Sequence, residues 1–207
     1  MKSQSDPLLG SIVLTGGQSR RMGQAKESLP FRGTTLLGWT VETLLRCTHP
    51  VIIVARDEAQ DLPPVPLEAD MAYDADPGGG PLVGLSAGLR ALQGHCDLAF
   101  VTGCDTPFLS ETPIGALVGR IGDAQVVVPR IGGTLQPLAA IYRIDVLDQV
   151  DALVAKGERS LVALVEQLRA KELDEKAMDE FDPGRQLLRN VNSREEYEAA
   201  VADAEKS

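Results

Sequence analysis

The stretch Ser11-Ile12-Val13-Leu14-Thr15-Gly16-Gly17, followed by Arg21-Met22-Gly23 and then Lys26, decides the fold of this chain. The apolar residues before the glycine pair predict a buried strand. The glycines predict a loop whose backbone N–H groups can approach a ligand. The arginine and the lysine add charge suited to phosphate oxygens. The segment therefore predicts a strand and a loop that hold a polyphosphate, although an ordinary surface turn with solvated cations has the same composition.

The loop differs from two better-known phosphate-binding motifs. A P-loop requires Gly-Lys-Ser/Thr, but Gly23 is followed by Gln24 and Ala25. A Rossmann dinucleotide fingerprint requires Gly-x-Gly, whereas Gln18-Ser19 follow the glycine pair.

Composition narrows the class of protein. A length of 207 residues suits one α/β domain, so we expect residues 1–207 to form a single unit. Aromatic residues make up only 4% of the chain, so aliphatic side chains must fill the core. The formal net charge of −10 argues against general nucleic-acid binding, which needs a basic face. A cationic loop in an acidic protein fits a small anionic ligand better.

Cellular location is predicted from what the sequence lacks. The segment 1–7 has no apolar stretch of the signal-peptide kind, and no apolar run reaches the length of a membrane span. Cys47, Cys96 and Cys104 form no Cys-x-x-Cys pair, and with two histidines a zinc site is not expected. Free thiols without an export signal predict the cytoplasm, with no membrane partner.

Short apolar runs alternate with helical patterns along the chain. We expect strands at residues 11–15, 51–54, 71–73, 98–101, 125–128 and 139–142, and helices at residues 35–46, 82–92, 114–121, 145–155, 160–170 and 194–202. This alternation predicts a mostly parallel sheet with helices on both faces. Right-handed crossovers would bring the carboxyl ends of the strands to one edge, where such folds bind ligands.

Two further segments follow predicted strands and should therefore lie at that edge. The loop from Asp74 to Leu82 carries Gly78-Gly79-Gly80 and can let a nucleotide lie against the backbone; a flexible loop with Pro81 at the first helical position is the alternative. Asp105 follows the 98–101 strand, and a carboxylate near bound phosphates suits Mg²⁺. By itself Asp105 could equally cap the next turn. Together with the cationic loop, we expect the metal role.

Fainter signals lie farther along the chain. Gln136-Pro137-Leu138 could shape a substrate pocket. Asn190 or Asn192 could donate to a phosphate, although Asn192 or Ser193 as a helix N-cap is the simpler account. Cys104 has no partner base in view, so we expect a small buried residue rather than a nucleophile.

Together these segments resemble the molybdenum cofactor guanylyltransferases, within a wider set of nucleotidyltransferases. The matching motifs run in order along nearly the whole chain: Leu14-Thr15-Gly16-Gly17, Arg21-Met22-Gly23, Lys26, Gly80-Pro81-Leu82-Val83-Gly84, Cys104-Asp105-Thr106-Pro107, Gln136-Pro137-Leu138, 157–161 and Asn190-x-Asn192. Each motif is modest, but the ordered set is specific.

The resemblance implies a three-layer α/β/α Rossmann-like nucleotidyltransferase fold and a reaction. GMP would pass from Mg-GTP to the terminal phosphate of molybdopterin-bound molybdenum, with release of pyrophosphate. The recipient molybdoenzymes and other cofactor-biosynthesis proteins are the macromolecular partners to expect.

The resemblance also implies site residues. The nucleotide would contact Leu14, Thr15, Gly16, Gly17, Lys26, Asp74, Gly80 and Asp105, with the first three lining the guanine pocket. The catalytic residues would be Arg21 and Lys26, which offset charge on the departing pyrophosphate, and Asp105, which holds the Mg²⁺.

Two positions depart from the family pattern. Thr15 replaces alanine, and Ala55 stands where the family often places an asparagine that touches the nucleotide. The rival interpretations are a related cytidylyltransferase, a transferase acting on a sugar or alcohol phosphate, and a nucleotide-binding protein without catalysis.

Overall fold

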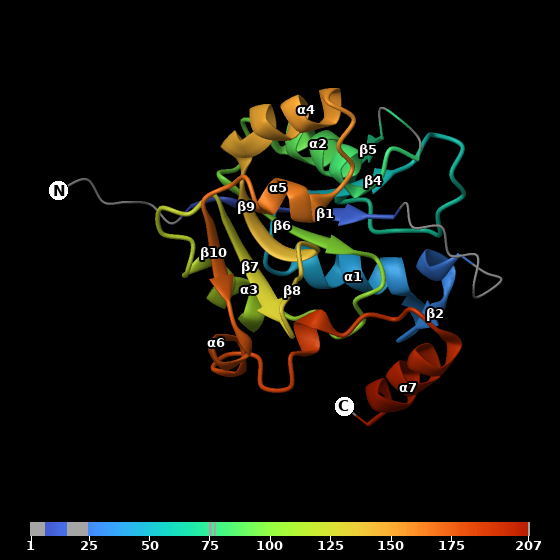
Figure 1. The fold of residues 1–207 in the computed structure, drawn as a ribbon. Helices are drawn as coiled ribbons and strands as arrows, with labels where there is room; N and C mark the ends of the chain where they lie inside the picture. The colour runs from blue at the N-terminus through green and yellow to red at the C-terminus, as the bar shows by residue number, and fades with distance from the viewer. Residues whose placement is uncertain (1–6, 16–24, 75, 77, 207) are drawn as a thin grey trace.

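The computed structural model describes residues 7–15, 25–74, 76 and 78–206. A twisted central sheet runs through the middle of the molecule (Figure 1). Its strands lie in the spatial order β10 (Ala170–Leu173), β7 (Val126–Ile131), β9 (Ala139–Arg143), β6 (Leu98–Gly103), β1 (Leu9–Leu14), β4 (Val51–Ala55) and β5 (Ala69–Tyr73), with the short β8 (Thr134–Leu135) paired to β7. All neighbouring pairs on this path are parallel except those of β9, which runs antiparallel to both β6 and β7.

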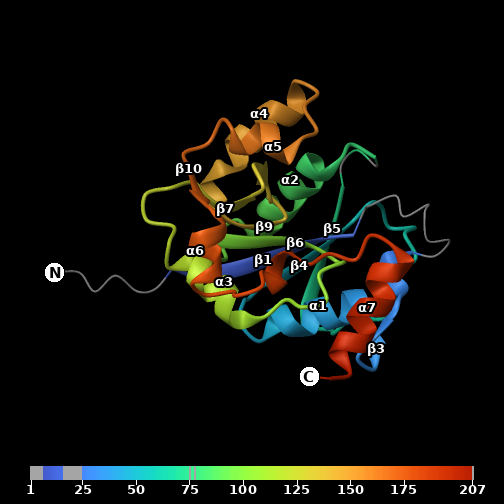
Figure 2. The same ribbon diagram turned by 60° about the horizontal axis from the view of Figure 1, so that its bottom comes forward.

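Helices cover both faces of the sheet (Figure 2). One face carries α2 (Pro81–Leu92), α4 (Leu147–Ala155) and α5 (Leu161–Val165), and their leucines and valines form one apolar core with the sheet. The other face carries α1 (Leu36–Leu45), α3 (Glu111–Val118) and α6 (Glu175–Asp179), which form a second core. Strands β4 and β6 are buried along their whole length, as expected of parallel strands between two helical layers. The expected three-layer α/β/α fold with a mainly parallel sheet is confirmed.

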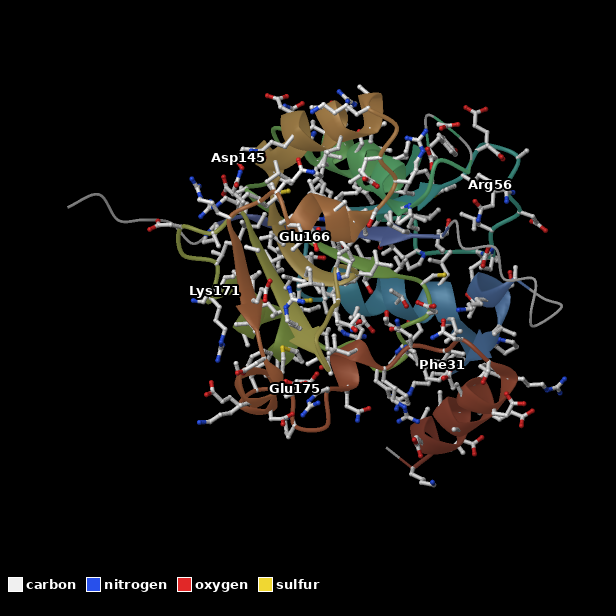
Figure 3. The ribbon with its side chains drawn as sticks, viewed as in Figure 1. Phe31, Arg56, Asp145, Glu166, Lys171 and Glu175 are labelled. Atoms are coloured by element: carbon white, nitrogen blue, oxygen red, sulfur yellow. The ribbon has the colours of Figure 1, made fainter. Side chains whose placement is uncertain are left out.

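A smaller unit packs the C-terminal helix against the hairpin that precedes α1. The hairpin β2 (Pro30–Phe31) and β3 (Thr34–Thr35) packs with the start of α1 against α7 (Arg194–Ala204), and Phe31 lies in this third core (Figure 3). Helix α7 begins with a capping box, in which the Ser193 hydroxyl accepts from the N–H of Glu196 and the Glu196 carboxylate accepts from the N–H of Ser193. The described residues also form the short 3₁₀ turns η1 (Lys26–Ser28), η2 (Ile144–Val146) and η3 (Gln186–Leu188).

The expected helix at residues 160–170 is wrong in its second half. Ser160 caps α5, because its hydroxyl accepts from the N–H of Ala163. The helix ends at Val165, and the chain then turns to form β10, which pairs in parallel with β7 from Ala170 onward. Sheet pairing at the free edge of β7 outweighs local helix preference here. In the described part of the chain, no helix is both long and apolar enough to span a bilayer.

Replacing Gly88 by alanine is expected to destabilise this fold. Gly88 lies on α2, and a methyl group there would come within 2.6 Å of Cγ2 of Ile12 on β1. Ile12 is fully buried, so overpacking should cost about 1–3 kcal/mol and lower the Tm in thermal denaturation.

The matched control for that substitution is Gly115→Ala in α3. Among the described residues nothing lies within 4 Å of the added Cβ. Removing a helical glycine from open space should stabilise by about 0.5–1 kcal/mol. Equal Tm values for the two variants would contradict this account of how α2 packs on the sheet.

Candidate active site

A cavity of about 360 Å³ lies at the edge where the parallel strands end. The residues at and just after the ends of β1, β4, β5 and β6 supply one wall: Leu14, Thr15, Val54, Ala55, Arg56, Asp74, Gly103, Cys104 and Asp105. The rest of the lining comes from η1, from around the start of α2 and from the loop before β9: Lys26, Glu27, Gly78, Gly80, Pro81, Gly84 and Leu138. This is the edge where open α/β sheets bind ligands.

The reversed strand β9 explains how Leu138 reaches this edge. Ala139, the first residue of β9, pairs with Thr102 near the end of β6. Because β9 runs against its neighbours, its beginning lies beside their ends. The segment Gln136-Pro137-Leu138 is thereby brought next to the cavity that the parallel strands form.

Lys26 and Asp105 meet at one end of the cavity. The Lys26 Nζ donates to Oδ2 of Asp105 at 3.0 Å and to Oδ1 of Asn192 at 2.9 Å. The two charged side chains are only 18% and 20% exposed. The N–H of Val191 also donates to the carbonyl of Asp105 at 2.9 Å, so the segment before α7 is fixed to the loop after β6. The predicted phosphate-binding lysine and the predicted metal ligand are therefore in direct contact.

Gly103 leaves room for the Asp105 carboxylate. A Cβ at position 103 would lie 2.7 Å from Oδ1 of Asp105. The turn is braced by Thr106, whose hydroxyl donates to the carbonyl of Gly103 at 3.2 Å and shares a hydrogen bond with the Thr102 hydroxyl. The end of β6 thus fixes where Asp105 points.

Asp74 and Asp76 separate in the structure. Asp74 lines the cavity, and its N–H continues the β4–β5 pairing by donating to the carbonyl of Ala55. Burial raises the pKa of the Asp74 carboxyl and the charge of Asp76 adds to this rise, while the Asp76 N–H and Arg159 oppose it. Asp76 instead pairs with Arg159, whose Nη2 lies 3.0 Å from Oδ2. Of the two carboxylates, Asp74 is the one placed to meet a ligand.

Gly80 has a conformation that favours glycine. Its φ is +84°, and it is the N-cap residue of α2, with Pro81 in the first turn. An added Cβ would also lie 3.2 Å from Cβ of Arg159. The glycine therefore lets the loop pass between the cavity and Arg159 at the start of the helix.

A polar cluster closes the side of the cavity near β1 and β4. The Thr15 N–H and hydroxyl both donate to the carbonyl of Val54, at 3.1 and 2.9 Å. The Gln60 Nε2 lies 3.2 Å from both the Thr15 carbonyl and Oε1 of Glu27. Arg56, labelled in Figure 3, lies on the same side of the molecule beyond the ends of these strands.

The structure describes some of the remaining predicted residues and not others. Gly16, Gly17 and Arg21 lie outside the described residues. Ala55 ends β4 and lines the cavity with 2% of its surface exposed, so this position offers only a methyl group there. Cys104 is buried as expected, and burial, followed by the nearby carboxylates, raises the pKa of its thiol, which favours the neutral form. Within the described ranges no three histidine, cysteine or acidic side chains gather as a metal-binding cluster.

A second cavity, of about 490 Å³, adjoins the first. The two share Pro81 and Leu138 in their linings. The second is also lined by Gln136, Pro137, Ala139, Glu158, Arg159, Ser160, Leu161, Val162, Leu188 and Asn190. Asn190 and Asn192, which the sequence offered as alternatives, thus serve different places: Asn190 lines the second cavity and Asn192 holds Lys26.

Sequence reasoning missed three polar residues of this site. Glu27 follows Lys26 directly and is only 7% exposed, and Gln60 sits in a loop without a motif. Arg159 lies in the 157–161 segment, to which the sequence motifs assign no role. A sequence pattern does not reveal that Glu27, a charged residue next to Lys26, is buried.

Comparison with known proteins agrees with this geometry. Residues 11–173 match the sequence profile of the MobA-like NTP transferase domain. A probable molybdenum cofactor guanylyltransferase of Mycobacterium tuberculosis is 43% identical over 165 residues, covering 77% of this chain and 80% of the relative. The molybdenum cofactor guanylyltransferase of Desulfosudis oleivorans is 33% identical, covering 92% of this chain and 93% of that protein.

A solved structure has the same fold. The molybdopterin-guanine dinucleotide biosynthesis protein A of Archaeoglobus fulgidus superposes with a TM-score of 0.80, at 23% identity, over 96% of this chain and all of that one. Fold and sequence together define a nucleotidyltransferase. Within that class, the chain belongs to the MobA-like family of molybdenum cofactor guanylyltransferases.

Proposed function

We propose that the protein transfers GMP from Mg-GTP to the terminal phosphate of molybdopterin-bound molybdenum, giving the guanine dinucleotide form of the cofactor and pyrophosphate. The observation that carries this proposal is the contact of Lys26 with Asp105 at one end of a cavity that adjoins a second cavity. A transferase needs such a pair of neighbouring sites, one for the donor and one for the acceptor.

The first cavity is the proposed donor site. Leu14 and Thr15 would face the guanine, with Gly16 and Gly17 in the loop that follows. Gly80 would let the nucleotide approach the backbone before α2, and Asp74 would contact it from the loop after β5. Lys26 would meet the phosphates, with Arg21 offsetting charge on the departing pyrophosphate.

The residues present fit a Mg²⁺ ion. Mg²⁺ is held by one or two carboxylates together with substrate phosphates. The Asp105 carboxylate lines the cavity with Lys26 as its counter-charge, and Asp74 lines the same cavity. Asp105 would hold the ion, which when bound supplies charge neutralisation around the reacting phosphorus.

The second cavity is the proposed acceptor site. Its polar lining includes Gln136, Arg159 and Asn190, which offer donors to a phosphate and to a polar ring system. Arg159 also pairs with Asp76 of the glycine loop, so this side chain links the two cavities. Pro81 and Leu138 lie at their common boundary.

The residues of this chain would act mainly by position and charge. An oxygen of the acceptor phosphate attacks the α-phosphorus of GTP while the bond to the pyrophosphate breaks on the opposite side. No covalent bond to the protein is required, because orientation and charge neutralisation can carry the rate. The proposed unit is the single domain of residues 1–207, working in the cytoplasm with cofactor-biosynthesis proteins and recipient molybdoenzymes.

GTP is expected to bind more tightly than CTP or ATP in a calorimetric titration with Mg²⁺ present. Backbone groups of the segment from Leu14 to Gly17, whose first two residues line the cavity, would read the edge of the base. Pyrophosphate release from GTP in the presence of the molybdenum-bound acceptor is the matching activity assay. Equal or tighter binding of CTP would contradict the guanylyl assignment, and binding without pyrophosphate release would favour a carrier without catalysis.

A further inference from the structure

Glu27 is a buried carboxylate in the wall of the donor cavity. It belongs to the short turn η1, and only 7% of its surface is exposed. Its neighbour Lys26 points to Asp105 and Asn192, whereas Glu27 contacts Gln60. The two consecutive charged residues, which both line the cavity, thus have different partners. A carboxylate is costly to bury, and one neutral amide donor does not use all of its acceptor capacity.

Gln60 fixes the orientation of this group. Its Oε1 accepts from the N–H of Arg56 at 2.7 Å, which sets the amide so that Nε2 faces the cavity wall. Nε2 then lies 3.2 Å from Oε1 of Glu27, 3.2 Å from the Thr15 carbonyl and 3.3 Å from the Thr15 hydroxyl oxygen. Gln60 is absent from the cavity lining, so it is a positioning residue behind Glu27 and Thr15.

The wall that results offers acceptors to a ligand. The carboxylate of Glu27 and the carbonyl of Thr15 are acceptors only. The Thr15 hydroxyl has already committed its hydrogen to the carbonyl of Val54, at 2.9 Å. A base that enters this end of the cavity therefore has to bring donors.

Guanine is the nucleobase whose edge fits such a wall. It presents two adjacent donors, the ring N1–H and the 2-amino group, which a carboxylate can accept together. Adenine and cytosine place an acceptor nitrogen beside their amino group, and uracil places carbonyls on both sides of its single N–H. A buried acceptor left facing another acceptor is the arrangement by which binding sites reject wrong ligands.

We propose that Glu27 selects guanine by accepting hydrogen bonds from N1–H and the 2-amino group, and that Gln60 holds it in place. The inference rests on the proposed use of a guanine nucleotide and deepens it, because it names the side chain that determines the base. It extends the contact beyond the backbone groups near Leu14 and Thr15.

The test is a change of base preference in Glu27→Gln, measured by calorimetric binding rather than by turnover. A glutamine keeps an acceptor for N1–H but turns a donor toward position 2. It should therefore bind GTP about 10- to 100-fold more weakly than the wild type and bind xanthosine triphosphate, which carries a carbonyl at position 2, about 10-fold more tightly. Inosine triphosphate, which lacks the 2-amino group, should bind the wild type more weakly than GTP and bind both proteins alike.

Two further variants complete the design. Glu42→Gln makes the same chemical change on the exposed face of α1 and should bind all three nucleotides as the wild type does. Gln60→Met keeps the size but removes the amide, so it should lose part of the preference of GTP over inosine triphosphate without gaining affinity for xanthosine triphosphate.

The outcomes separate this inference from the proposed function. A wild type that fails to bind GTP would overturn both. A wild type that binds GTP, with Glu27→Gln keeping the wild-type order of nucleotides, would overturn the role of Glu27 alone. An equal loss of affinity for all three nucleotides in Glu27→Gln, together with a lower Tm, would likewise overturn it and assign Glu27 to the folding of the loop.

Discussion

Asp105→Asn is expected to lower the rate of GTP-dependent pyrophosphate release about 1,000-fold while the fold survives, because the substitution removes an electrostatic contact at the reacting phosphate. The asparagine keeps the size of the side chain and its place in the turn braced by Gly103 and Thr106. It removes the negative charge that Mg²⁺ requires. The Mg²⁺ concentration that gives half the maximal rate should rise, measured by titrating Mg²⁺ at saturating GTP.

The same titration in Asp74→Asn and Asp76→Asn locates the ion. Asp74 lines the cavity and should show an intermediate effect, whereas Asp76 pairs with Arg159 and should leave the metal dependence near that of the wild type. Unchanged metal dependence in Asp105→Asn, with loss in either of the other two variants, would move the metal site to the glycine loop.

Lys26→Ala is expected to lower kcat/KM for GTP about 100-fold, because a phosphate contact of this kind is worth on the order of 3 kcal/mol. The lysine bridges Asp105 and Asn192 and is largely buried, so its removal leaves the Asp105 carboxylate without its partner and should cost about 1–3 kcal/mol of folding free energy and several degrees of Tm. Steady-state kinetics and a thermal scan on the same preparation measure both effects.

Lys171→Ala is the matched control for that variant. Lys171 is an exposed lysine on the edge strand β10, far along the sheet from the donor cavity, and its loss should leave both quantities unchanged. Wild-type kcat/KM in Lys26→Ala would remove the lysine from the phosphate site, and a large loss of Tm without a kinetic effect would make it a structural link to α7.

The sheet was predictable where burial and sequence pattern agree. The runs that became β1, β4 and β6 are apolar on both faces, because each lies between two helical layers, and glycines mark the ends of β1 and β6 in the sequence. Lys26 and Asp105 were predictable as a pair for the same reason, since both follow strands that end at one edge. The break between α5 and β10 was not predictable from the local pattern, because it depends on pairing with the distant strand β7, and this pairing begins at Ala170, the last residue of the expected helix.

The missed parts of the site depend on contacts between distant segments. Gln60 reaches Thr15 across 45 positions and Glu27 across 33, and no local pattern around Gln60 indicates either contact. In the sequence, Glu27 resembles an ordinary surface charge, but in the structure η1 places it in the lining of the cavity. The sequence allows either Asn192 or Ser193 as the helix cap; the Ser193 hydroxyl takes that role at the start of α7, and the Asn192 side-chain oxygen accepts from Lys26.

The contact between Lys26 and Asn192 bears on where this protein can be divided. The match to the family profile ends at residue 173, and a boundary drawn there would keep the whole central sheet. It would also remove Val191 and Asn192, which hold the loop of Asp105 and the side chain of Lys26. It would expose the apolar side of the β2–β3 hairpin as well. The unit that holds Lys26 and Asp105 in place is therefore larger than the region that matches the family profile, and a chain ending after β10 would keep the sheet but lose the contacts of Asn192 and Val191 with these two residues.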